Sequence, residues 1–142
     1  MTQTPPTLTA LTTYLLSQAG KAARGLMAER LAAEGLRLWH MATLAALADF
    51  GSQAQRELGE RLAVHPSDMA KVLEELAAGG LVERDRDPAD RRRVLVTLTP
   101  AGRRALDHQT AQALAVQDSV LAPLSPGERS ELHRLLLRVY RR

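Results

Sequence analysis

The chain has 142 residues, a formal net charge of +3 and an apolar content of 45%, which together indicate one compact domain and exclude a disordered chain. The absence of cysteine excludes disulfides, thiolate metal sites and cysteine-based redox sensing. There is no apolar run of 18 residues and no basic, apolar secretion signal at the start, so we expect a cytoplasmic protein without a membrane span.

Helical periodicity dominates the first half of the chain. Apolar residues recur at spacings of three and four over residues 8–31, which predicts a long first helix, and a second apolar stripe on it suggests burial against two partners. A second helix is expected over residues 39–50, ended by Gly51. We expect a third helix over residues 53–62 with Ser52 as its N-cap.

A fourth helix followed by a β-hairpin is the central feature of the sequence. The helix is expected from Pro66 to Ala78, because proline suits the first helical position. The runs 82–84 and 94–99 have strand character and are expected to pair. Between them lies a tip dense in charge, Asp85 to Arg93, where Pro88 after an Asp is typical of a type I turn.

The last third of the chain predicts two more helices. One begins at Pro100 and is stopped by Pro123. The other follows Ser125, which forms a capping box with Glu128. The prediction is therefore six helices and two strands, a mainly α fold with a small β-hairpin.

The order of these elements is that of a winged helix-turn-helix, a module that binds duplex DNA. Its second helix enters the major groove, and an arginine at the hairpin tip, or wing, can reach the adjacent minor groove. We expect residues 1–142 to form a single domain in which the winged helix-turn-helix occupies residues 36–100 and the wing residues 81–99. Long helices flank it in residues 8–34 and 101–142.

The segment ELGERLAVHPSDMAKVLEELAAGGLVERDRDPADRRRVLVTLTPAGRRAL resembles the MarR family of bacterial transcription regulators, most specifically in DPADRRR and VLVTLTPAG. Helix order and chain length match the family from end to end. The resemblance implies a homodimer joined through the N- and C-terminal helices and bound to a pseudo-palindromic operator in double-stranded DNA. It also implies repression, often relieved by a small aromatic effector.

Candidate DNA contacts in the wing combine the resemblance with simple electrostatics. By position, Arg92 resembles the wing arginine that enters the minor groove, and Asp90 resembles the acidic residue that orients it. Phosphate contacts are expected from Arg86, Arg91 and Arg93. A solvated turn in which acids and arginines pair with one another is the alternative.

Candidate DNA contacts in the fourth helix are Ser67, Asp68 and Lys71. Lys71 falls where the family usually has an arginine, and Ser67 where it has Ser or Thr. Asp68 could accept a hydrogen bond from a cytosine amino group or simply favour the helix start. Glu75 lies where a basic residue is common, so we expect that end of the helix to point away from DNA. Arg37 is expected to lie in a loop away from the module and to matter less.

An effector cavity between the dimerisation helices and the winged module is a further hypothesis. Its candidate lining residues are Tyr14, Arg24, Trp39, His40 and Leu44, and simple core packing is the alternative for each.

Other site chemistries find little support. His40, His108 and Gln112 invite a metal site, but no further ligand stands at the spacing of a tetrahedral set. We also find no nucleophile paired with a base and no Gly-rich phosphate loop, so no enzyme, cofactor or metal is expected. The rival function is a winged-helix protein-interaction module without sequence-specific DNA binding.

Overall fold

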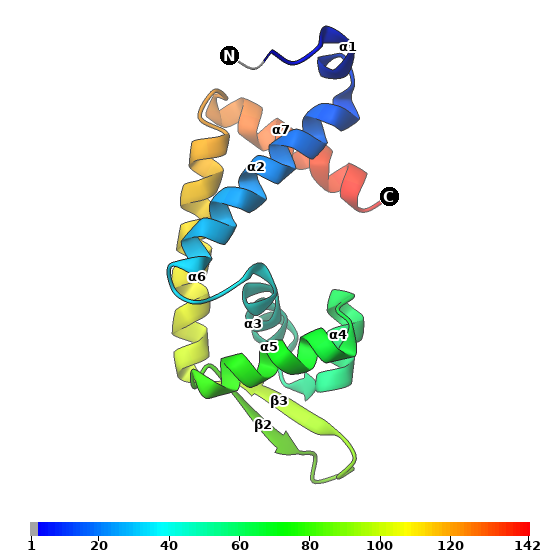
Figure 1. Cartoon of the computed structure of the whole chain (residues 1–142), viewed down its shortest axis with the longest axis vertical. Helices are drawn as coiled ribbons and strands as arrows, with labels where there is room; N and C mark the ends of the chain where they lie inside the picture. Colours follow the sequence, from blue (N-terminus) through cyan, green and yellow to red (C-terminus); the bar gives the residue numbers. More distant parts are fainter. Residues whose placement is uncertain (1–2) are drawn as a thin grey trace. The chain divides into compact units, whose positions relative to one another are not determined.

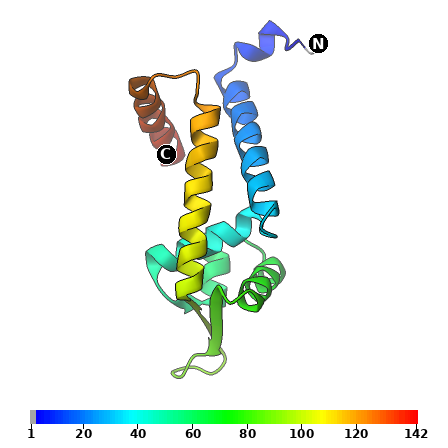
Figure 2. The same ribbon diagram turned by 90° about the vertical axis from the view of Figure 1, so that its left-hand side faces the viewer.

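The computed structural model describes residues 3–142 and forms two compact units, each considered by itself (Figures 1 and 2). The second unit is Ala28–Gln112; the first combines Ala113–Arg142 with the N-terminal part of the chain up to Met27. The helices are α1 Pro6–Thr9, α2 Thr12–Ala32, α3 Leu38–Phe50, α4 Gln55–Leu62, α5 Pro66–Ala78, α6 Pro100–Val120 and α7 Pro126–Tyr140. The strands are β1 Gln53–Ala54, β2 Val82–Arg86 and β3 Val94–Leu98.

The predicted hairpin is confirmed and gains a third strand. β2 pairs antiparallel with β3, with Val82 opposite Leu98 and Arg86 opposite Val94. β1 pairs with the other edge of β3, which gives the strand order β1-β3-β2. The two-residue β1 was not predicted, because so short a strand carries no periodic signal and exists only through its partner.

The start of the third predicted helix was wrong for the same reason. The chain through Gln53 and Ala54 is extended in β1, so α4 begins at Gln55 and Ala54 is its N-cap. The Glu57 carboxylate accepts a hydrogen bond from the Ala54 N–H at 3.3 Å. Ser52 does not cap the helix; its hydroxyl donates to Oγ1 of Thr97 at 3.0 Å.

The first predicted helix is divided into α1 and α2 near Ala10 and Leu11. The Thr9 hydroxyl donates to the Pro6 carbonyl at 3.2 Å, and Thr12 and Thr13 follow at once. Side chains of this type compete for backbone hydrogen bonds and are stiff at χ1, which weakens a helix. The described residues therefore form seven helices and three strands, one more of each than predicted.

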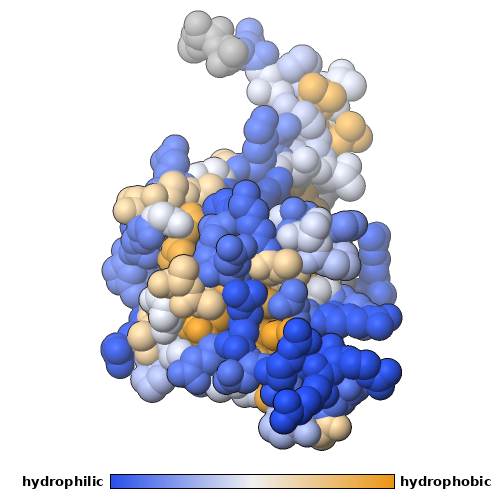
Figure 3. Space-filling view, turned by 60° about the horizontal axis from the view of Figure 1, so that its bottom comes forward, coloured by the Kyte–Doolittle hydropathy of each residue, from blue (hydrophilic) through white to orange (hydrophobic). Residues whose placement is uncertain are grey.

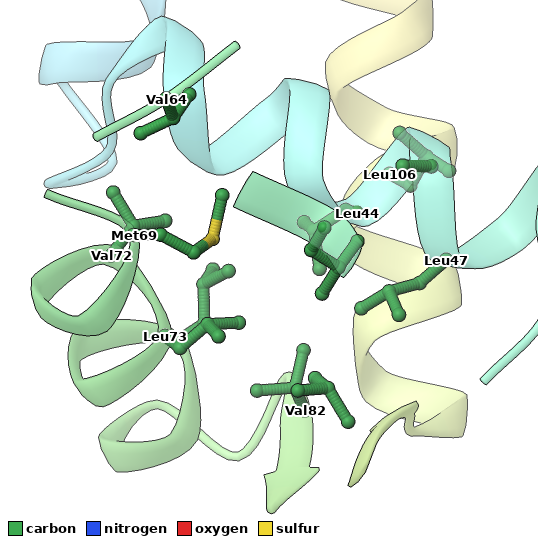
Figure 4. Packing of buried hydrophobic residues seen from close by; sticks show 12 residues of the cluster. Leu44, Leu47, Val64, Met69, Val72, Leu73, Val82 and Leu106 are labelled. Carbon is green, nitrogen blue, oxygen red and sulfur yellow. The ribbon is translucent and has the colours of Figure 1, made fainter. Parts of the chain in front are cut away.

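One hydrophobic cluster holds the second unit together and fixes which face of α5 is exposed (Figure 4). It draws side chains from α3, α4, α5, both hairpin strands and the start of α6. From α5 it takes Met69, Val72, Leu73 and Leu76, all almost completely buried. Burying each such side chain contributes about 1.5–3 kcal/mol. Because this stripe faces inward, the opposite side of α5 faces solvent.

Gly102, in the first turn of α6, packs directly under the hairpin. A Cβ at this position would lie 2.1 Å from the carbonyl oxygen of Leu81 and 2.6 Å from Cδ1 of Leu98. Only glycine fits at position 102 of the VLVTLTPAG motif, because the backbone that leads into β2 occupies the space that a side chain would need.

The remaining sequence predictions of helix ends agree with the structure. Gly51, with φ of 82°, follows α3, and α5 spans Pro66–Ala78 as expected. Ser125 and Glu128 form the predicted capping box at the start of α7, with hydrogen bonds of 3.2 and 2.9 Å. Along residues 3–142, no helix combines the length and the apolar character needed to cross a bilayer.

Candidate nucleic-acid interface

The exposed face of α5 carries the polar residues predicted for the fourth helix. Ser67, Asp68 and Lys71 are all exposed. The His65 imidazole caps this helix, because its Nδ1 accepts the Ser67 N–H at 3.2 Å and lies 2.8 Å from the Ser67 hydroxyl oxygen. Among the residues that the structure describes, Lys71 forms no ion pair, so its ammonium group is free for an anion. The N-terminal half of α5 is thus a solvent-facing surface of short polar groups with one free cation.

The wing tip is built from two consecutive turns. The Asp90 N–H donates to the Asp87 carbonyl at 3.2 Å, and the Ala89 N–H donates to the Asp87 carboxylate at 2.9 Å, so Pro88 holds the expected second turn position. In the next turn the Asp90 carboxylate accepts the Arg92 N–H at 3.1 Å. The charged residues of the tip are therefore placed by an ordered backbone.

Asp90 also contacts the Arg92 side chain. The Arg92 Nε donates to Oδ1 of Asp90 at 3.2 Å, while the Arg92 side chain remains 92% exposed. The hydrogen bond from the Arg92 side chain is the main reason that the pKa of Asp90 lies below its ordinary value. The arrangement agrees with the expected orienting contact, and the DNA contact of Arg92 itself stays a prediction.

The other tip arginines have different surroundings. Arg86 donates from Nη1 to the Arg91 carbonyl at 3.1 Å, which ties β2 to the tip. Arg93 is half-exposed and its Nη2 lies 2.7 Å from Oε1 of Glu57 in α4. Arg91 is exposed, and within residues 3–142 its side chain makes no hydrogen bond or ion pair. Hydrophilic side chains gather over the wing end of the surface in Figure 3.

A groove of about 1280 Å³ opens between α4, the turn before α5 and the wing tip. Its walls include His65 and Met69 on one side and Arg92 and Arg93 on the other. Of the predicted contacts, Asp90, Arg92 and Arg93 line this groove, whereas Ser67, Asp68 and Lys71 of α5 do not.

Glu75, at the other end of α5, is held by the start of α3. Its Oε1 lies 3.2 Å from Nη2 of Arg37, and its Oε2 lies 3.2 Å from Nε2 of His40. Nδ1 of His40 accepts the Arg37 N–H at 2.8 Å, so Nε2 carries the proton and donates to Glu75. The expectation that Arg37 lies away from the module was wrong, because its guanidinium contacts α5.

His40 is completely buried, and burial is the main reason that its pKa lies below the ordinary value. The Glu75 carboxylate opposes this effect, and the Arg37 guanidinium adds to it. The imidazole is therefore neutral at neutral pH and acts as a hydrogen-bonded link between α3 and α5.

The five predicted effector residues lie in two different units. Tyr14 and Arg24 belong to α2 in the first unit, whereas Trp39, His40 and Leu44 belong to α3 in the second. Leu44 is completely buried in the hydrophobic cluster, and His40 is bonded to Glu75, so both have structural roles. Trp39 is 44% exposed. The cavity itself stays a prediction.

Gln109 is a polar residue that sequence reasoning missed. It lies on α6, is completely buried, and neither its Oε1 nor its Nε2 has a hydrogen-bond partner among the described residues. Nothing in the local sequence distinguishes it from the exposed polar residues around it.

The residues considered for a metal have other partners. His108 pairs with Glu34, and Oε1 of Gln112 accepts a hydrogen bond from Arg30 Nη1 at 2.6 Å. Residues 3–142 contain no group of three potential acidic, histidine or cysteine ligands.

Two short helices with a tight turn, followed by an antiparallel hairpin packed on them, define a winged helix-turn-helix protein. Residues 34–93 match a family model described as the MarR family. Over 94 residues, 66% of this chain, the sequence is 37% identical to the HTH-type transcriptional repressor NicR of Pseudomonas putida, and it spans 60% of that protein's length. The HTH-type transcriptional repressor Rv2887 of Mycobacterium tuberculosis is 30% identical over 123 residues, 87% of this chain and 88% of Rv2887.

Two solved structures resemble about nine tenths of the chain. The crystal structure of Rv2887 in complex with DNA has a TM-score of 0.80 at 28% identity and covers 91% of this chain and 97% of that one. Bordetella bronchiseptica BpsR, whose DNA binding is regulated by 6-hydroxynicotinic acid, has a TM-score of 0.75 at 30% identity and covers 90% and 97%. The chain belongs to the MarR family, and the predicted fold and family are confirmed.

Proposed function

We propose that this protein is a dimeric, sequence-specific DNA-binding transcription regulator that acts as a repressor in the cytoplasm and catalyses no reaction. The observation that carries the proposal is the pairing, within one compact unit, of a solvent-facing polar α5 with an arginine-rich wing. Relatives that are named repressors, and a related chain solved with DNA, support it.

The proposed complex places the N-terminal half of α5 in the major groove. That groove admits a helix and displays a different set of donors and acceptors for each base pair. Lys71 would contact a phosphate or a base edge, and Ser67 and Asp68 would lie at the groove floor or its wall. Arg92, whose Nε is bonded to Asp90 and whose side chain is 92% exposed, would enter the neighbouring minor groove, where negative potential is concentrated. Arg86 and Arg91 would contact phosphates.

The first unit supports dimerisation through a second copy of the chain. It leaves large apolar side chains 38–84% exposed in its helices and in the break between α1 and α2: Leu11, Leu15, Leu16, Leu26, Leu114, Leu135, Leu136, Val139 and Tyr140. Monomers rarely expose so many apolar groups together, so another copy of this surface is the expected cover. Sedimentation equilibrium at micromolar concentration should give the mass of a dimer. A monomer that does not change on dilution would contradict this part of the proposal.

DNA-binding assays test the main proposal. Duplexes selected from a random library should be bound, and affinity should fall roughly a thousandfold or more between 50 and 200 mM salt if six to ten phosphates are contacted. Arg92→Ala should weaken binding of the selected duplex while leaving folding and dimerisation unchanged. Arg138→Ala, an exposed arginine of α7, is the matched control for the loss of one positive charge. Absence of duplex binding even at low salt would instead favour the protein-interaction module.

Relief of binding by a small aromatic effector is the second part of the proposal. The similarity of this chain to BpsR, at 30% identity and a TM-score of 0.75, supports it. BpsR responds to one such compound, 6-hydroxynicotinic acid. Tyr14 and Arg24 in the first unit and Trp39 in the second remain candidate contacts of an effector, whereas His40 and Leu44 are held by structural contacts.

Thermal-shift measurements with aromatic acids test the effector, because a ligand that binds only the folded protein raises its melting temperature. 6-Hydroxynicotinic acid and benzoates are the first compounds to try. A compound that stabilises the wild type should also weaken its binding to the selected duplex. No stabilisation by any member of the series would remove the support for effector control.

A further inference from the structure

We propose that Arg93 and Glu57 form a positioning pair that holds the wing against α4, so that Arg92 is presented to the minor groove. The inference rests on the proposed DNA-binding function and gives Arg93 a different role from the phosphate contact expected from the sequence. Two neighbouring arginines then have different roles: Arg92 contacts DNA, and Arg93 holds the wing tip in the position that presents Arg92 to the DNA.

Glu57 is itself immobilised at the start of α4. One carboxylate oxygen accepts the Ala54 N–H at 3.3 Å, and the other lies 2.7 Å from Nη2 of Arg93. Ala54 is also part of β1, which pairs with Leu95 of β3. The carboxylate therefore lies where α4 and the sheet meet, and it is not a freely rotating surface group.

Arg93 also contacts both arms of the wing tip. Its N–H donates to the Asp90 carbonyl and its carbonyl accepts the Asp87 N–H, each at 2.9 Å. Its Nε lies 4.0 Å from the Asp87 carboxylate, which is largely buried at 17% exposure. Main chain and side chain together thus connect the tip, across the groove, to the helix-turn-helix.

Arg92 differs from Arg93 in every one of these respects. Its side chain is 92% exposed, against 44% for Arg93, and its partner Asp90 belongs to the same turn. Nothing in the described residues ties the Arg92 side chain to α4. A guanidinium that enters the DNA minor groove has to be exposed to solvent. A guanidinium that holds the wing tip next to α4 has to contact both the tip and α4.

A double-mutant cycle separates positioning from phosphate contact. The variants are Glu57→Gln, Arg93→Met and the double variant Glu57→Gln with Arg93→Met. Glu57→Gln keeps an acceptor for the Ala54 N–H, and Arg93→Met keeps the alkyl chain, so both should fold; circular dichroism checks this. The dissociation constant for a selected duplex is measured by fluorescence anisotropy between 50 and 200 mM salt.

Positioning predicts that each single variant weakens binding about two- to fivefold, the range expected for a half-exposed ion pair. The double variant should bind the duplex no more weakly than the single variant that binds it less tightly, because both changes break the same ion pair. The slope of affinity against salt should stay that of the wild type. Hydrogen exchange of the tip amides should accelerate in each single variant.

Phosphate contact predicts the opposite pattern and would overturn the inference. Arg93→Met would then reduce the salt slope by about 0.9, the value for one lost phosphate contact. Glu57→Gln would release the arginine and tighten binding. Arg92→Ala serves as the reference: if the wild type binds duplex and Arg92→Ala weakens it while the pair variants do nothing, only the positioning role fails. If the wild type binds no duplex, the proposed function fails instead.

Discussion

Replacing Glu75 with alanine removes the carboxylate that joins α5 to the start of α3. The buried Nε2–H of His40 then loses its acceptor, and Arg37 loses its partner. The Arg37 guanidinium is 53% exposed and can donate to water, whereas the His40 side chain is only 1% exposed and its Nε2–H is left without an acceptor. We therefore expect the variant to be less stable, and its α5 to be less firmly held, than the wild type.

The two lost contacts differ in how much free energy each contributes to stability. Leaving a buried donor without a partner costs about 1–3 kcal/mol, and the His40 side chain is only 1% exposed. The Arg37 pair is 53% and 40% exposed and is worth about 0.2–1 kcal/mol at most. The free energy of unfolding should thus fall by about 2 kcal/mol, most of it from His40.

Urea unfolding at pH 7.5 and a fixed protein concentration measures this change. Glu74→Ala is the matched control, because Glu74 is exposed on the same helix and has no partner among the described residues; it should change stability by less than about 0.5 kcal/mol. Glu75→Gln retains an oxygen acceptor for His40 and should recover most of the loss. Equal stabilities for Glu75→Ala and Glu74→Ala would refute the proposed link between α3 and α5.

Three further predictions concern single positions. The pKa of buried His40 is lowered, so near pH 6.5 the unfolded chain takes up a proton that the folded chain does not. The free energy of unfolding should therefore fall as the pH drops below about 6.5. Urea titrations at several pH values measure this dependence, and His40→Gln should flatten it. Gly102→Ala should destabilise by about 3 kcal/mol or more, since its Cβ would overlap the Leu81 carbonyl; a normal melting temperature would contradict this. Ala63 has a left-handed φ of 54°, which glycine adopts more readily than alanine, so Ala63→Gly should raise the free energy of unfolding by about 0.5–1 kcal/mol. A lower free energy of unfolding in this variant would contradict the idea that the backbone at Ala63 is strained.

Features whose cause lies in a few consecutive residues could be predicted from the sequence. The bounds of α5 follow from Pro66 and from the glycines after Ala78, and the capping box of α7 follows from Ser125 and Glu128. The contact between Asp90 and Arg92 was expected from the family resemblance, and it is also local, because the two residues share one turn.

Features that depend on distant partners could not be predicted. β1 forms only because β3 lies beside it, and Arg93 finds Glu57 across 36 positions of sequence. The pairing of Arg37 with Glu75 spans 38 positions. At Glu75 the sequence indicated only a helix end that points away from DNA; its partners Arg37 and His40 are shown by the folded chain.

The placement of β3 between β1 and β2 has a consequence for the order of folding. A strand bonded on both edges cannot be complete until the turn before α4 has formed, so the wing should not fold as an independent hairpin. The peptide 81–99 alone should be unstructured in water, and amide exchange in β3 should require global unfolding of the unit instead of local fraying. The wing and the helix-turn-helix would then be lost together in one cooperative step.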